Sequence, residues 1–66
     1  MSNHFIVSPN GGEGWVVRRM GSQRILAQSR TKRQAESQGR SLARESRGVV
    51  SFRNSQGQFS GSTRYN

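Results

Sequence analysis

The stretch Thr-Lys-Arg-Gln-Ala-Glu-Ser-Gln-Gly-Arg-Ser-Leu-Ala-Arg-Glu-Ser-Arg-Gly, residues 31–48, decides the fold because it carries the signals of one helix. Thr31 with Gln34 three residues later is a capping box, in which each side chain satisfies an exposed backbone donor of the other. Gly48 is placed to cap the C-terminal end. Small residues around one leucine recur at helical spacing and predict a narrow face that packs closely on a sheet: Ala35, Gly39, Leu42, Ala43 and Ser46.

Three short strands are predicted before the helix. Residues 4–7, 14–20 and 23–28 are rich in apolar and β-branched side chains, and turn residues separate them. The first turn contains Pro-Asn-Gly-Gly, and the second is the pair Gly21-Ser22. A meander of three strands is the simplest arrangement.

Two more strands are predicted after the helix, at residues 49–53 and 58–60, and residues 61–66 read as a short polar tail on a single domain of residues 1–60. We therefore expect an α+β fold, a small antiparallel sheet of four to five strands with one helix packed on one face, in the order β-β-β-α-β-β. The residues expected on the inner surface are Phe5, Val7, Trp15, Val17, Ile25, Ala35, Leu42, Ala43, Val50 and Phe52. The pattern does not decide which member of the adjacent pairs Phe5/Ile6 and Ile25/Leu26 points inward.

The composition bounds the class of protein. Hydrophobic residues make up 29% of the 66-residue chain, so the core is thin, and the absence of cysteine excludes disulfides. We therefore expect a homodimer, which is one way for a small domain to bury more surface. The first residues lack the apolar segment of a signal peptide, and no stretch is long and apolar enough to cross a membrane, so a soluble, cytoplasmic protein is expected.

The charge is strongly one-sided. Ten arginines and one lysine face three glutamates and no aspartate, which gives a net charge of +8. Such a surface attracts polyanions, and the planar guanidinium group binds phosphates and guanine edges with two hydrogen bonds. The alternative is a charge that serves solubility only.

Four arginines fall inside an arc of roughly 60° on a helical wheel, beside the small apolar face. With Lys32 and the strand residue Arg53, they form the predicted nucleic-acid-binding set: Arg33, Arg40, Arg44 and Arg47. No motif for sequence reading accompanies them, so phosphate contacts with little sequence specificity are predicted. The residues leave open DNA against RNA, and single against double strands. The rival hypothesis is a small phage-type interaction or inhibitor module that docks on an acidic protein surface.

The chain offers no catalytic or metal-binding constellation. It has one histidine, His4, and its glutamates are scattered at positions 13, 36 and 45. One histidine without cysteine or aspartate builds neither a metal site nor an ordinary catalytic triad. We therefore expect no enzyme activity, no metal and no cofactor.

The order of motifs resembles a known family. Gly14-Trp15-Val16-Val17 follows an apolar strand and a proline-containing turn, and Thr-Lys-x-x-Ala then opens the helix. Val-Val-Ser-Phe comes next, followed by Gly57 just before Phe59 and a tyrosine near the end. Over nearly the whole chain this is similar to a family of short bacterial and phage proteins known as domain of unknown function 2188.

The resemblance implies a compact fold of a sheet and a helix, and it transfers no activity. Members usually carry more lysine and glutamate in the helix, and often an aspartate before the glycine of the last turn. Here the helix is rich in arginine, and Gln56 precedes the glycine.

Overall fold

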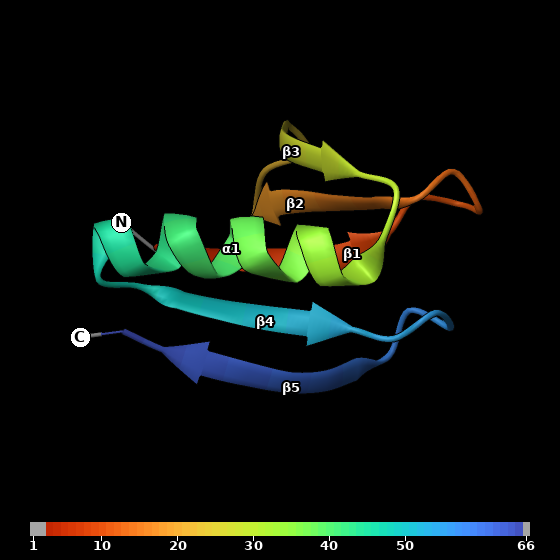
Figure 1. The fold of residues 1–66 in the computed structure, drawn as a ribbon. Coiled ribbons are helices and arrows are strands. Elements are labelled where there is room, and N and C mark those ends of the chain that lie inside the picture. The colour runs from red at the N-terminus through yellow and green to blue at the C-terminus, as the bar shows by residue number, and fades with distance from the viewer. Residues whose placement is uncertain (1–2, 66) are drawn as a thin grey trace.

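One helix lies across one face of a five-stranded sheet in the computed structural model, which describes residues 3–65 (Figure 1). This confirms the predicted α+β class and the order of the elements. The helix crosses the middle of the sheet, with β2 and β3 on one side of it and β4 and β5 on the other (Figure 1). The elements are β1 (His4–Pro9), β2 (Trp15–Arg19), β3 (Ile25–Ser29), α1 (Lys32–Ser46), β4 (Val49–Arg53) and β5 (Phe59–Arg64).

The sheet is mixed, which corrects the prediction of an antiparallel sheet. Its strand order is β3-β2-β1-β4-β5, and the central pair β1 and β4 is parallel, while the three other pairs are antiparallel. The reason is the crossover: α1 runs back along the sheet, so β4 starts at the same end as β3 and runs in the direction of β1. β4 therefore adds to the free edge of β1, and no hairpin joins these two strands.

The main core cluster lies between α1 and the three inner strands, β2, β1 and β4. Val7, Val17 and Val50 are fully buried below Gly39, whose missing side chain lets the helix approach the sheet. This confirms the predicted role of the small helix face. The buried cluster comprises Phe5, Val7, Val17, Ala35, Ala43, Val50 and Phe52, with Trp15, Ala27, Leu42 and Tyr65 packed at its margin.

Ile25 is not part of this core, although the sequence predicted it there. It pairs with Arg18 on the face of the sheet away from the helix, and 43% of its surface is exposed. An irregularity in the β2–β3 register at this point shifts the alternation of β3, so Leu26 and Ala27 line the helix side. In β1, Phe5 points to the helix and Ile6 to the other face.

The last strand is longer than the sequence suggested. Residues 61–64, expected in a polar tail, pair with β4 from Phe52 back to Val49. Tyr65 then donates its backbone N–H to the carbonyl of Gly48, 2.8 Å away, and its side chain packs against the core. Backbone pairing with β4 holds this segment in the sheet. The sequence did not predict it as a strand, because its side chains are small and polar and have low β-propensity.

The two ends of the helix differ in how well the sequence predicted them. The Thr31 hydroxyl accepts the backbone N–H of Gln34 at 3.2 Å, as expected for the N-cap. At the other end Arg47, not Gly48, adopts the left-handed conformation, with φ 55°. The N–H groups of Arg47 and Gly48 donate to the carbonyls of Arg44 and Ala43, which is the hydrogen-bond pattern of a Schellman motif.

Candidate nucleic-acid interface

The exposed flank of α1 carries a row of three arginines, Arg33, Arg40 and Arg44. At about 100° per residue the three side chains project within roughly 40° of one another. From the first to the last the row extends about 16 Å, since a helix rises about 1.5 Å per residue. We call these three residues the helix arginine row.

The position of the row relative to the sheet is fixed by Arg40. Its guanidinium carbon lies 4.9 Å from the centroid of the Phe52 ring, so the row lies on the β4 side of the helix. Phe52 itself is 6% exposed, which means that the arginine covers the margin of the core. Arg33 and Arg44 lie to either side of Arg40 and are exposed.

The helix arginine row is not neutralised within the part of the chain that the structure describes. The one ion pair there joins Lys32 Nζ to Glu36 Oε2 at 4.0 Å, and both side chains are partly exposed. Glu36, which lies between Arg33 and Arg40 in the helix, is therefore engaged with lysine, and Glu45, which directly follows Arg44, projects about 100° away from it. Unpaired guanidinium groups at short spacing repel one another and attract an external anion.

The other predicted residues lie apart from the row. Lys32 points toward β2, with its amine 5.7 Å from the centroid of the Trp15 ring. Arg47 has left the helix, because its left-handed conformation ends the 3.6-residue repeat. Arg53 lies on the opposite face of the sheet from α1, next to Phe59. The six predicted residues thus form one row of three and three separate positions.

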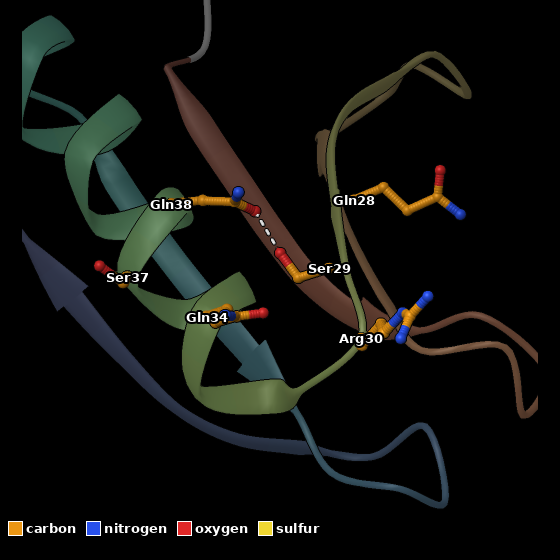
Figure 2. Close-up of a pocket in the computed structure, with 6 residues that line it drawn as sticks. All are labelled: Gln28, Ser29, Arg30, Gln34, Ser37 and Gln38. Atoms are coloured by element: carbon orange, nitrogen blue, oxygen red, sulfur yellow. Dashed lines mark hydrogen bonds between the residues drawn. The ribbon is translucent and has the colours of Figure 1, made fainter.

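A hollow between β3 and α1 contains polar residues that the sequence did not single out (Figure 2). Its volume is about 490 Å³, and Ser29 Oγ donates a hydrogen bond to Gln38 Oε1 across it at 2.6 Å. Figure 2 shows Gln38 and Ser29 reaching toward each other, while Gln28 points away from the helix. No carboxylate lines the hollow, whose residues are Gln28, Ser29, Arg30, Gln34, Ser37 and Gln38.

A second, more apolar hollow of about 280 Å³ adjoins the first and shares Ser37 and Gln38 with it. Leu26 of β3 and Leu42 of α1 line it. Neither hollow was predictable from the sequence, because both lie beside β3 at the edge of the sheet. The strand order, which no local pattern encodes, puts β3 at that edge.

The profile of a family described as uncharacterised proteins conserved in bacteria, domain of unknown function 2188, matches residues 5–65. The chain belongs to this family. The resemblance drawn from the order of its motifs is thereby confirmed. No curated protein and no solved structure matches this family member.

Two further features of this domain of unknown function 2188 protein bear on the class of site. Among residues 3–65 no group of three histidine, cysteine, aspartate or glutamate side chains gathers at metal-binding distance. Over the same residues no helix combines the length and the apolar character that a membrane span requires.

Proposed function

We propose that this protein binds nucleic acid without catalysing a reaction, mainly through contacts of the helix arginine row with the phosphate backbone and with little sequence specificity. The observation that supports the proposal is the row itself: three exposed guanidinium groups along about 16 Å of helix, none paired with a carboxylate in the described residues. One strand of duplex DNA carries about five phosphates over such an axial length. A cytoplasmic location belongs to the same proposal.

The helix arginine row is suited to binding nucleic acid of any sequence, not to recognising particular bases. Guanidinium groups that contact phosphates set position and register, and they carry no information about the bases. The helix also packs on the sheet by its small residues, so its exposed flank lies on the surface along its whole length. We therefore expect similar binding to duplexes of different sequence.

A salt titration tests this proposal. Three phosphates neutralised by the row contribute about −2.7 to the slope of log affinity against log salt on duplex DNA, and four to six phosphates in total, with contacts from other basic residues, give about −4 to −5. The informative variant is Arg33→Gln with Arg44→Gln, since glutamine keeps helix propensity and leaves the Arg40–Phe52 contact intact. Two lost phosphate contacts should flatten the slope by about 1.8 units.

The matched control is Arg24→Gln with Arg30→Gln, two exposed arginines near β3 and away from the row. Both double variants lower the formal net charge by two, from +8 to +6. A slope that flattens equally in both variants shows that net charge alone matters, and the row then has no special role. Absence of binding at low salt by the wild type would also end the proposal.

A second candidate function is docking on an acidic protein partner. Ile25 and Leu26 at the outer strand β3 are 43% and 40% exposed, and Leu26 lines the apolar hollow beside α1. An edge strand next to such a hollow is a geometry that accepts an added peptide strand. The net charge of +8 favours an acidic partner. Affinity capture from nuclease-treated lysate discriminates, because a stoichiometric protein retained at moderate salt favours docking, whereas recovery of nucleic acid alone opposes it.

Self-association through a strand edge is part of the proposal. Both outer strands, β3 and β5, have a free edge in the described chain. The exposed Leu26 on β3 is the apolar residue that favours this edge for a homodimer. Sedimentation at micromolar concentration should give a species of twice the 7.4 kDa chain, and Leu26→Lys should return it to a monomer. A single 7.4 kDa species throughout would exclude the dimer.

A further inference from the structure

The sheet face away from α1 is covered by no helix or strand of the described chain (Figure 1). Strand alternation and pairing place its residues in rows across the sheet. One row is Ile25, Arg18, Ile6, Ser51 and Ser62, from β3 to β5. Arg53 and Phe59 form a neighbouring pair on this face, and Val49 and Arg64 form another. We call this surface the open face.

The open face is basic, and among residues 3–65 no acidic side chain lies on it. It carries Arg18, Arg53 and Arg64 from three different strands. Two of the chain's glutamates, Glu36 and Glu45, lie on α1, and Glu13 lies in the turn between β1 and β2. With neighbouring strands about 4.8 Å apart, the three arginines extend over roughly 14 Å of sheet. This charge complements an extended anion.

Arg53 and Phe59 differ from the other cation–aromatic pairs of the protein. The Arg53 guanidinium carbon lies 4.6 Å from the centroid of the Phe59 ring, which is 57% exposed. In the pairs of Arg19 with Phe5 and of Arg40 with Phe52, the ring is buried and the arginine merely covers it. At Phe59 the ring itself faces solvent, and burying such a ring would release its hydration water.

The Arg53 side chain also carries an unsatisfied donor. Its Nε–H is shielded from solvent and has no hydrogen-bond partner in the described residues. Internal hydrogen bonding therefore does not explain its position, and the contact with Phe59 does. A guanidinium over an aromatic ring offers a stacking surface and leaves its terminal nitrogens for a phosphate.

We infer that the open face binds single-stranded nucleic acid, with an unpaired base stacked on Phe59 beside Arg53 and with Arg18 and Arg64 contacting the backbone. The inference rests on the proposed function and adds to it a second surface and a strand preference. An exposed aromatic ring within a basic surface is how single strands are held without sequence selection. A duplex engages it poorly, because unstacking a paired base costs a few kcal/mol.

The test compares Phe59→Leu with Phe59→Tyr by fluorescence anisotropy. Leucine keeps an apolar side chain and removes the ring, whereas tyrosine keeps the ring. The probes are labelled oligo(dT) of about 12 nucleotides, an abasic oligonucleotide of equal length and a duplex. The length follows small single-strand-binding domains of another fold, the OB fold, whose sites cover about 4–16 nucleotides. Phe59→Leu should bind oligo(dT) roughly 5- to 150-fold more weakly than the wild type does, because one stacked base is lost. Phe59→Tyr should bind oligo(dT) like the wild type. The duplex should bind equally to the wild type and to both variants.

The abasic probe isolates the base. The wild type should bind it as weakly as Phe59→Leu binds oligo(dT), because the phosphates remain and the stacking partner is gone. Circular dichroism of both variants checks that the exposed site tolerates the change. The inference is overturned if Phe59→Leu binds oligo(dT) as tightly as the wild type, or if the abasic probe binds as well as oligo(dT).

The outcome also separates this inference from the proposed function. Duplex binding that depends on Arg33 and Arg44, together with unchanged oligo(dT) binding by Phe59→Leu, refutes the open face alone. Failure of the wild type to bind any probe at low salt refutes both. Loss of self-association by Phe59→Leu, with nucleic-acid binding intact, would make the open face a contact between copies of the chain and would also refute the inference.

Discussion

A methyl group at Gly39 would lie 2.7 Å from Cγ2 of Val7. The helix thus rests on the sheet with no room for a side chain at its midpoint. Ala35 and Ala43, one turn before and after, are fully buried and continue the same close contact. This contact fixes the height of α1 above the sheet and with it the position of the helix arginine row.

Gly39→Ala should therefore destabilise the fold, although alanine is the better helix former. The gain in helix propensity is about 1 kcal/mol, and overpacking a close contact costs about 1–3 kcal/mol. The Cγ2 atom of Val50, 3.0 Å from the same methyl position, restricts the room for relaxation. Urea unfolding should show a net loss of about 1 kcal/mol, whereas the exposed control Ser37→Ala should show none. Stabilisation by Gly39→Ala would contradict the close packing.

Arg47→Gly should stabilise the protein. Arg47 has φ 55°, a conformation that costs a residue with a Cβ roughly 1–2 kcal/mol and costs glycine little. Glycine also loses more entropy on folding, so we expect a net gain of about 0.5–1 kcal/mol in thermal or urea unfolding. Arg47→Ala is the control, because it removes the same charge and keeps the Cβ. An equal gain in both variants would assign the effect to charge.

At the next position the opposite change should be damaging. A Cβ on Gly48 would collide with the backbone oxygen of Asn3 and lie 2.6 Å from the Asn3 Cβ. That oxygen accepts the N–H of Val49 at 2.9 Å, so it has little freedom to move. Gly48→Ala should cost about 1–3 kcal/mol by urea unfolding. Gly61→Ala is the matched control, since its Cβ meets open space; a similar loss there would refute the collision.

Val50 and Leu42 should contribute differently to the stability of the fold. Val50 is fully buried, whereas Leu42 is half-buried and lines the hollow beside Leu26. A fully buried leucine typically loses 2–5 kcal/mol on truncation to alanine, and we expect less than that for Leu42→Ala. Val50→Ala removes fewer atoms but leaves a closed cavity, and should cost about 2 kcal/mol. A larger fall in Tm for Leu42→Ala than for Val50→Ala would contradict this and would show that the packing around Leu42, near β3, contributes more to stability.

Salt should stabilise the fold while it weakens nucleic-acid binding. With a net charge of +8 and one ion pair in the described residues, the folded chain repels itself. Raising NaCl from about 10 mM to about 150 mM shortens the Debye length from about 30 Å to about 8 Å and screens this repulsion. Calorimetry should show a rise in Tm, smaller in the Arg33→Gln, Arg44→Gln variant. A falling Tm would show that attractive pairs dominate.

The helix and the meander were predictable because their signals are local. The Thr31 cap, the small residues around Gly39 and the turn glycines each act over a few positions, and the structure contains all of them. The strand order was not predictable, since the parallel pairing of β1 with β4 joins segments that are far apart in the chain. The prediction that Ile25 points inward was wrong for a similar reason, because no clear residue pattern marks the register irregularity between β2 and β3.

The candidate site was predictable in part. A helical wheel suffices to group Arg33, Arg40 and Arg44, because their relation depends on α1 alone. It misplaced Arg47, since a non-glycine residue in the left-handed conformation is uncommon. The stacking of Arg53 on Phe59 depends on the register of β4 with β5, which appears only when the sheet is assembled.

The central place of β1 has a consequence for how the chain reaches its fold. β1 pairs with β2 through a short turn, but its other edge stays free until β4 arrives from beyond the helix. Until then β1, which carries Phe5 and Val7, has one unpaired edge, and such an edge can pair with a strand of another molecule. Such long-range pairing slows the last folding step, because the connecting segment loses conformational entropy before the stabilising contacts between β1 and β4 form. A nascent chain that stops after α1 is therefore the form most exposed to aggregation.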